Sequence, residues 1–558
     1  MKTTLHWEPP STASASELKA IMGPGAKLEL IEQEVLGVLQ PVFARRLPHL
    51  RALLEQGASQ YSQSPYLVHP GGVVSFGEAA GLVANMAEYL RKEFGVAKGD
   101  KVALAAPTCV EHVIAAWAVI VLGGVIVGLN GWSSGPEMEH GIEMTEPKLL
   151  LGDSRRLERV EGRFRGLPRH NLAELDPVLA AVPPAKMPST PIDEDDPFVI
   201  LFTSGTTGRP KGAVLSHRNN LHWIQSIALR TACSGRAPVR DSCEIAALPM
   251  FHISGLNAQA ISSVATGTTL VYQSAEQRWS SEEHLRLSEH HRVTTWRIVP
   301  TQGWKLSECR SATERDLSCL RSVSFGGSFV SPVLIERMTK LWPQIGPGLV
   351  VGFGMTETNG TGASATAAEV LSQPGCVGKP LPGSAVRLCE PRSAVQCEDG
   401  EVGEIQIRSA SVFLGYHNDQ ASTSAAVDDQ GWYRTGDFGR VINGLLALEG
   451  RRSDLIIRNG ENIYPREIED RLLEHPGVVE AVVFGIPDRI KGELVAAIVV
   501  RRPRTVVDVE ELRDWIGERL AGFKIPEHIE FATELPRNAL GKTMKHLLNA
   551  NQPMVHAG

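Results

Sequence analysis

The segment that follows the apolar run Phe198–Phe202 is rich in Ser, Thr and Gly, residue types that suit phosphate binding. The run predicts a buried strand. Glycines let the backbone approach an anion closely, and hydroxyl and amide donors suit phosphate oxygens. We therefore predict a phosphate-binding loop, although an ordinary turn uses the same residue types. The loop lacks the Gly-Lys pair of the common NTPase motif. Its predicted binding residues are Thr203, Ser204, Gly205, Thr206, Thr207, Gly208 and Lys211.

A second polar stretch, residues 351–358, places glycines on both sides of Phe353 and then a Thr-Glu pair. The aromatic ring suits stacking on a flat base. A threonine hydroxyl suits a phosphate, and a carboxylate suits Mg²⁺, which prefers oxygen ligands. A solvent-exposed loop glutamate is the alternative. The predicted site residues of this stretch are Gly352, Phe353, Gly354, Met355, Thr356 and Glu357.

Further candidate residues follow glycine turns. Gly326 and Gly327 end a predicted strand, where a ligand can approach closely. Asp437 follows a tight glycine turn and suits two ribose hydroxyls, although it could simply cap the turn. The charged run 450–465 lies at a change in composition, and Lys542 lies on a glycine turn near the C-terminus. A lysine is a compact, mobile charge that suits an anionic transition state.

Composition excludes several classes of protein. The chain has 558 residues, of which 42% are hydrophobic and 21% charged, so it can bury a large core and form several structural units. A net charge of −7 argues against nucleic acid as the main partner. Eight scattered cysteines without a Cys-x-x-Cys pair predict reduced thiols and a cytoplasmic protein. No signal peptide is predicted. Gly123-Gly124 interrupts the apolar stretch 113–129, so we expect a buried helix and strand rather than a transmembrane segment.

Hydrophobic patterning predicts an α/β protein. From 66 to 150 and from 213 to 350, helix and strand signals alternate, as in a parallel sheet covered by helices. Residues 28–39 show helical patterning, and the proline-rich stretch 155–197 is predicted to be a connector. Short strands between 376 and 450 predict a small β-barrel. The last hundred residues, from about 453, predict a separate α+β domain.

Taken together, these motifs resemble the adenylate-forming superfamily of acyl-CoA synthetases, nonribosomal peptide synthetase adenylation domains and luciferases. The resemblance covers residues 40–548 and is most specific at 203–212 and 450–465. It implies a large N-terminal adenylation domain over 1–452, built from parallel α/β sheets and a small β-barrel. It also implies a mobile α+β C-terminal lid over 453–558, with the hinge at Ser453 or Asp454.

The resemblance also implies roles for single residues. The 203–211 loop would hold the β- and γ-phosphates, Thr356 the α-phosphate and Glu357 the Mg²⁺ ion. Lys542 would stabilise charge that develops between the attacking carboxylate and the α-phosphate. The catalytic set implied is Thr206, Thr356, Glu357 and Lys542. The resemblance implies an adenine slot at Gly326, Gly327 and Phe353 and a ribose site at Asp437 and Arg451. It also implies a thiol tunnel at Gly460, Glu461 and Asn462, and an acid site at His252, Gly327 and Gly354.

The activity implied is an ATP-dependent acid–thiol ligase that uses Mg²⁺ and coenzyme A. A carboxylic acid is first converted to an acyl-adenylate with release of pyrophosphate, and the acyl group then passes to the thiol. We expect a medium- or long-chain fatty acid, with an aryl acid as the alternative. An acyl-AMP ligase that loads a carrier protein, a luciferase-like monooxygenase and a nucleotide-binding regulator without turnover are further alternatives. Whether the chain forms a homodimer is open.

Overall fold

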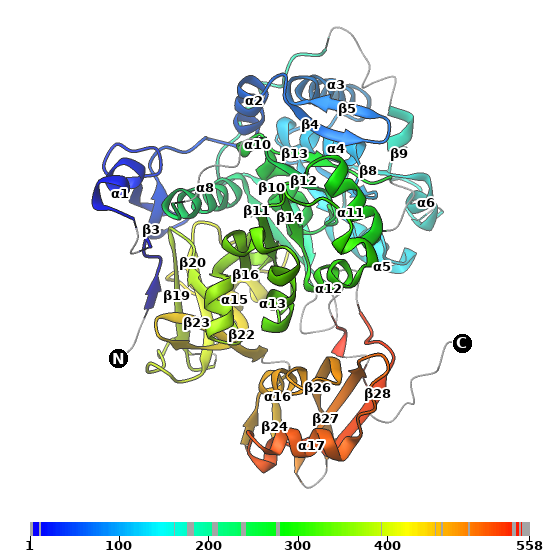
Figure 1. Ribbon diagram of the computed structural model, residues 1–558. Helices are drawn as coiled ribbons and strands as arrows, with labels where there is room; N and C mark the ends of the chain where they lie inside the picture. Colours follow the sequence, from blue (N-terminus) through cyan, green and yellow to red (C-terminus); the bar gives the residue numbers. More distant parts are fainter. Residues whose placement is uncertain are drawn as a thin grey trace.

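The computed structural model describes most of the chain (Figure 1). The described residues are 4–10, 13–160, 162–175, 184–203, 210–235, 241–274, 279–391, 393–451, 454–458, 461–488, 491–537, 543–545 and 548. Within them the fold is mixed α/β, as predicted. Two large sheets and their helices form the upper part in Figure 1, and a small α+β unit lies below them.

A seven-stranded sheet carries the start of the predicted phosphate loop. Its central strands are parallel and almost completely buried, as the apolar runs predict. In order across the sheet the strands are β21 (Gly415–Tyr416), β11 (Lys211–Ser216), β10 (Pro197–Thr203), β7 (Val125–Gly128), β6 (Lys101–Ala105), β8 (Leu149–Gly152) and β9 (Arg169–Asn171). The edge strand β9 lies in the stretch predicted to be a connector.

A fourteen-stranded sheet forms the rest of the upper part. One half is mostly parallel: β16 (Leu349–Met355), β15 (Ser322–Phe325), β14 (Thr295–Ile298), β12 (Cys243–Ile245), β13 (Thr269–Val271), β4 (Pro65–His69) and, antiparallel to β4, β5 (Gly72–Ser75). The other half is antiparallel: β1 (Thr4–His6), β19 (Ser384–Cys389), β20 (Gly403–Ser409), β22 (Tyr433–Ile442), β23 (Leu445–Arg451), β18 (Cys376–Pro380) and β17 (Gly360–Thr366). This antiparallel half occupies the region expected to form a barrel, and its hydrogen bonding continues into the parallel half.

Helices begin and end where the sequence provides caps. Helix α3 (Phe76–Phe94) begins with a capping box of Ser75 and Glu78 and ends at Gly95 in the left-handed conformation. Helix α4 (Val110–Leu122) is almost entirely buried and ends at Gly123. The apolar stretch around α4 is therefore a core helix followed by strand β7. Among the described residues, none of the helices is long and apolar enough to cross a membrane.

Further helices of the upper part cover the sheets or connect their strands (Figure 1). They are α1 (Ala15–Met22), α2 (Leu50–Gln60), α5 (Gly135–Thr145), α6 (Ser154–Leu157), α8 (His217–Cys233), α9 (Ile253–Gly255), the π-helix η3 (Leu256–Ile261), α10 (Ser262–Thr266), α11 (Ser281–His290), α12 (Pro300–Glu308), α13 (Pro332–Leu341), α14 (Ala367–Ser372) and α15 (Gln420–Ala426).

The helical patterning predicted over residues 28–39 is wrong. The segment forms a hairpin of β2 (Leu30–Val35) and β3 (Val38–Phe43), joined by Leu36 and Gly37 at φ 50° and 83°. Two consecutive residues with positive φ form the tight turn that matches the twist of a hairpin. The short apolar pattern fits either a helix or a strand, and the tight turn at these two residues makes the segment a hairpin.

The C-terminal unit has its own core. Helices α16 (Pro465–Leu473) and α17 (Val509–Gly517) contribute to it together with a small sheet. The strands of that sheet are β24 (Ile456–Arg458), β25 (Glu461–Ile463), β26 (Val478–Asp488), β27 (Gly492–Arg501) and β28 (His528–Ala532). A separate core supports a separate C-terminal domain, while the boundary at 452/453 and the mobility of the lid stay predictions.

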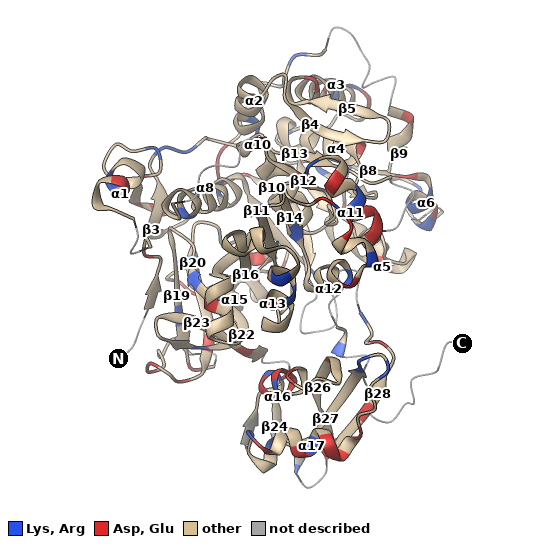
Figure 2. Ribbon diagram, in the orientation of Figure 1, with Lys and Arg blue, Asp and Glu red and all other residues tan. Residues whose placement is uncertain are grey.

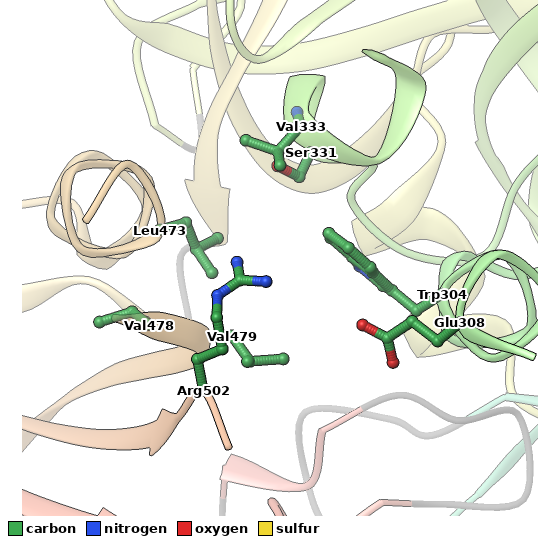
Figure 3. A pocket seen from close by; sticks show the side chains of 8 residues that line it. All are labelled: Trp304, Glu308, Ser331, Val333, Leu473, Val478, Val479 and Arg502. Carbon is green, nitrogen blue, oxygen red and sulfur yellow. Dashed lines mark hydrogen bonds between the residues drawn. The ribbon is translucent and has the colours of Figure 1, made fainter. Parts of the chain in front are cut away.

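Described residues of the C-terminal unit contact the upper part. The Arg466 guanidinium lies over the ring of Phe329. Trp304 and Glu308 of α12 border a small cavity opposite Val479 and Arg502 of the C-terminal unit (Figure 3). Figure 2 shows basic and acidic residues interspersed along both parts.

Because several histidines are buried, we expect the free energy of unfolding to fall in mild acid. Burial lowers the pKa of His112 and His252 to about 4, and of His217, His222 and His284 to about 3. The unfolded chain binds these protons below about pH 6.5 and the folded chain does not, so stability is fully present above pH 6.5 and falls as the pH drops toward 4. Each such histidine removes about 2 kcal/mol of unfolding free energy at pH 5.

His284 offers a test of this pH dependence with a matched control on the same helix. In α11, His284 is buried and His290 is exposed. The free energy of unfolding is measured by urea titration at several pH values. We expect it to fall less between pH 6.5 and 5 in His284→Gln than in the wild type, whatever the effect of the substitution at pH 8. His290→Gln should leave the wild-type slope unchanged. Equal slopes in all three proteins would contradict the assignment.

Candidate functional site

A cavity of about 1660 Å³ opens where strands of both large sheets end. Strands β10, β14 and β15 run toward it with their carboxyl ends, the usual ligand position in such sheets. Its volume exceeds that of an ordinary ligand pocket, so it can hold a nucleotide and a second molecule. Predicted site residues that line it are Thr203, Lys211, His252, Gly326, Gly327, Gly352, Gly354, Met355, Thr356, Glu357 and Asp437.

The two ends of the predicted phosphate loop lie at this cavity. Thr203 ends β10, and Lys211 begins β11, its antiparallel neighbour. The Lys211 Nζ donates to Ser422 Oγ at 2.7 Å and lies 5.1 Å from the centre of the Tyr416 ring. The residues that flank the predicted loop therefore both line the cavity. The predicted residues Ser204, Gly205, Thr206, Thr207 and Gly208 lie outside the described residues.

Glu357 brings a buried carboxylate to the cavity. It follows β16 in a short 3-10 turn with Thr356. Tyr416 Oη donates to Glu357 Oε1 at 2.9 Å. Burial, with the nearby Glu357 charge, raises the pKa of Tyr416, so the phenol stays a proton donor at neutral pH. The donor fixes one carboxylate oxygen in place.

The Glu357 carboxylate fits Mg²⁺ in combination with phosphates. In the described part of the chain, no group of three or more His, Cys, Asp or Glu residues could hold a metal ion. Mg²⁺ is commonly bound by one or two carboxylates plus substrate phosphates and water. The buried Glu357 carboxylate, in the same cavity as the residues that flank the predicted phosphate loop, matches that pattern.

Glycines keep one wall of the cavity open. Gly327 has φ 82°, a conformation that favours glycine. A Cβ on Gly354 would lie 1.7 Å from the Gly360 carbonyl oxygen, so only glycine fits there. A Cβ on Gly326 would meet no atom within 4 Å and would project into open space. This surface therefore has room for a flat group such as a nucleotide base.

Phe353 differs from its expected place. It alternates along β16 with Gly352 and Gly354, and its side chain packs with Ile405 and Ile407 in the core of the antiparallel half. The ring is not among the residues that line the cavity. The structure therefore does not bring Phe353 into the adenine slot with Gly326 and Gly327.

Asp437 lies on the cavity wall in β22. It is buried, its backbone N–H donates to Thr435 Oγ1 at 3.0 Å, and it pairs in register with Arg451 of β23. The structure thus brings together the two residues predicted for the ribose. Nothing further is described of the Arg451 side chain. A carboxylate at this place can accept two hydroxyl hydrogen bonds.

We expect Asp437→Ala to raise the KM for ATP about 10- to 100-fold, because a hydrogen bond to a charged group contributes about 1.5–3 kcal/mol. The KM for the acid should change little. Initial rates of pyrophosphate release at varied ATP measure the effect. Asp429→Ala, in the turn before β22, is the control. An unchanged KM for ATP would remove Asp437 from the nucleotide site.

The part of the cavity beside the 253–266 helical segment is the part predicted to hold the acid, and it is here called the acyl pocket. His252 precedes this segment at the cavity, and burial keeps its pKa at about 4, so its imidazole is neutral at pH 7. The acyl pocket is defined by Trp223, Ile253, Ser254, Ala258, Arg297, Ser324, Gly352 and Thr361.

The structure does not describe the side chains of the predicted C-terminal site residues. Gly460 and Lys542 lie outside the described residues, and only the backbone of Glu461 and Asn462, in β25, is described. Conversely, sequence reasoning did not single out Tyr416 or Arg297. No motif marks either residue, because each acquires its place through strands distant in sequence.

Comparison with known proteins agrees with this geometry. The AMP-binding enzyme model matches residues 54–417, and the AMP-binding enzyme C-terminal domain model matches residues 467–542. The chain is 37% identical over 458 residues to 2-succinylbenzoate–CoA ligase of Bacillus licheniformis, covering 82% of this chain and 91% of that protein. It is 32% identical over 483 residues to feruloyl-CoA synthase of an Amycolatopsis species, covering 86% and 94%.

Solved structures are similar over the same extent. The o-succinylbenzoate CoA synthetase of Bacillus subtilis, in complex with its acyl-adenylate intermediate, superimposes with a TM-score of 0.77. It is 31% identical, and the match covers 91% of this chain and 99% of that one. ATP-bound MatB from Rhodopseudomonas palustris has a TM-score of 0.79 at 27% identity, with 89% and 98% covered.

The chain therefore belongs to the AMP-binding enzyme family, in the adenylate-forming superfamily. It is an enzyme of the acid–CoA ligase class, and that class uses ATP, Mg²⁺ and coenzyme A. The resemblance inferred from the motifs, the α/β fold with a C-terminal domain and the ligase activity are all confirmed at this level.

Proposed function

We propose that the protein activates a compact aryl-substituted acid and transfers it to coenzyme A, in preference to a long fatty acid. The observation that carries the proposal is the mixed character of the acyl pocket's wall. Arg297, which pairs with the buried Glu244, lines the same pocket as apolar side chains such as Ile253. A long alkyl chain entering the pocket would remove water from the Arg297 guanidinium without offering it a hydrogen-bond acceptor, which is costly. The relatives named for 2-succinylbenzoate, ferulate and indoleacetate support an aryl acid.

The cavity residues supply distinct parts of adenylate formation in this proposal. Thr203, Lys211 and Thr356 hold the phosphates, and Asp437 holds the ribose. Glu357 holds the Mg²⁺ ion, which neutralises phosphate charge when bound. Fixed donors aimed at developing charge lower the barrier without reorganising during the reaction. Neutral His252 lies beside the acyl pocket, where it positions the acid and adds no charge.

The C-terminal unit completes the site in the proposal. Lys542 approaches the α-phosphate for adenylate formation. A rotation near Ser453 and Asp454 then brings residues 460–462 to the thiol tunnel. We also propose a cytoplasmic location, supported by eight cysteines that are all free. The oligomeric state is not part of this proposal, and a homodimer is one outcome of a light-scattering measurement.

A substrate panel tests the proposal. Thioester formation with coenzyme A is measured by mass spectrometry for aryl acids and for fatty acids of 8–18 carbons. We expect kcat/KM for the best aryl acid to exceed that for every fatty acid. A preference for a fatty acid would restore the expectation from sequence. Adenylate that passes only to a carrier protein would instead support the acyl-AMP ligase alternative.

A further inference from the structure

Arg297 is a cation placed on the wall of the acyl pocket. It lies on β14, in register with Ser324 of β15, and both residues line the pocket. Its neighbour Trp296 is fully buried in the core of the parallel half, on the opposite face of the strand. The alternation of the strand therefore presents this side chain to the pocket.

Two contacts hold the Arg297 guanidinium in place. Arg297 Nε lies 3.4 Å from Glu244 Oε2, and Nη1 donates to Ser262 Oγ at 3.2 Å. Glu244 is almost fully buried and also accepts from Gln259 Nε2 at 2.6 Å. A buried carboxylate anchored in this way fixes the arginine, whose side chain stays 28% exposed.

One edge of the guanidinium is left for a ligand. In the part of the chain that the structure describes, Arg297 Nη2 has no hydrogen-bond partner. A guanidinium pairs with a carboxylate through two parallel N–H donors, which gives both strength and direction. The held orientation lowers the entropy lost when such a ligand binds.

A second donor on the pocket wall is also unpaired. Trp223 is 4% exposed, and its indole Nε1 is buried with no hydrogen-bond partner among the described residues. Leaving a buried donor unpaired costs about 1–3 kcal/mol. A purely hydrocarbon substrate would leave both Trp223 Nε1 and Arg297 Nη2 unsatisfied. The pocket is thus built for an acid that brings its own acceptor oxygens.

We propose that Arg297 selects acids with a second anionic group, a carboxylate or its equivalent, at the end remote from the carboxylate that is activated. This inference rests on the proposed function and specifies its substrate class. Glu244 is a positioning residue, which acts through Arg297. The remote anion would contact Arg297 and take no part in the adenylate and thioester steps.

Matched acids measure the selectivity. 3-Phenylpropanoate is compared with 3-(4-carboxyphenyl)propanoate and with the corresponding 4-carboxamide. We expect kcat/KM for the dicarboxylate to exceed that for the unsubstituted acid about 10- to 100-fold, as a charge-assisted hydrogen bond allows. The carboxamide should fall between them. The KM for ATP should be the same with all three acids.

Variants assign the selectivity to Arg297. Arg297→Leu should bring the ratio of the two kcat/KM values to 1 or below, while 3-phenylpropanoate still forms a thioester. Arg297→Leu removes the ion-pair partner of the buried Glu244 and can destabilise the fold for that reason. The double variant Arg297→Leu/Glu244→Gln is therefore the second test, and it should show the same ratio. Arg297→Lys should keep part of the preference. Arg310→Leu, which removes a 96% exposed arginine, should keep all of it.

The outcomes separate this inference from the proposed function. Thioester formation with a ratio near 1 in the wild type, or an unchanged ratio in both Arg297→Leu proteins, overturns the role of Arg297 and leaves the ligase proposal standing. No thioester from any acid in the aryl and fatty panels overturns the proposed function itself.

Discussion

Replacement of Glu357 by glutamine is expected to lower the rate of adenylate formation by about 10²–10³-fold, the range found when one charge-stabilising group is removed from a preorganised site. Glu357 is buried at the cavity, and no cluster of other metal-ligating side chains is found among the described residues. The amide loses the negative charge that would hold Mg²⁺. Its oxygen can still accept from Tyr416 Oη, which now contacts Oε1 at 2.9 Å.

The Mg²⁺ dependence distinguishes this role from a structural one. Pyrophosphate release is measured at saturating ATP and acid over a range of Mg²⁺ concentrations. Glu357→Gln should raise the Mg²⁺ concentration needed for half-maximal rate, together with the loss in kcat. Glu143→Gln, an exposed glutamate at the rim of the same cavity, is the matched control. A lower kcat with an unchanged Mg²⁺ requirement would argue against metal binding by Glu357.

Replacement of Lys542 by alanine is expected to affect only one of the two half-reactions. The C-terminal family model matches up to this residue, although its structure lies outside the described part. A lysine that stabilises charge between the acid and the α-phosphate is needed while the adenylate forms. Its loss should slow that step about 100-fold or more. Thioester formation from added acyl-adenylate should largely survive.

Separate assays of the half-reactions test this asymmetry. Acid-dependent exchange of pyrophosphate into ATP reports the first step, and conversion of synthetic acyl-adenylate with coenzyme A reports the second. Lys545→Ala is a control of the same charge, three residues away, where the side chain pairs with Glu469 at 2.9 Å. Equal losses in both half-reactions of Lys542→Ala would contradict the assigned role.

Sequence patterns predicted the elements of the fold whose signals are local. Helix α3 carries its capping box and its C-terminal glycine in the sequence, and α4 is bounded by a glycine pair. The 30–43 hairpin was missed because its turn begins at Leu36, which seldom adopts a positive φ. Phe353 was predicted for the adenine slot. In β16 its side chain packs in the core, and its glycine neighbours line the cavity instead.

The side-chain pairs that build the site could not be predicted from local motifs. Arg297 pairs with Glu244, 53 residues earlier in the chain, and Tyr416 reaches Glu357 from another sheet. Such pairs depend on strand order and register, which no local motif encodes. The residues predicted to bind ATP stand in recognisable runs, whereas the residues proposed to bind the acid are scattered along the chain. The sequence therefore indicated the reaction class more clearly than the substrate.

The most direct test of the account is the balance of products from ATP, coenzyme A and a remote-anion aryl acid such as 3-(4-carboxyphenyl)propanoate. Chromatography and mass spectrometry follow AMP, pyrophosphate and the acyl-CoA thioester over time. We expect all three in equal amounts, none without the acid, and a rate at least 100-fold lower in Glu357→Gln. ADP and phosphate in place of AMP and pyrophosphate, or ATP consumption that does not depend on any acid, would contradict the ligase reaction.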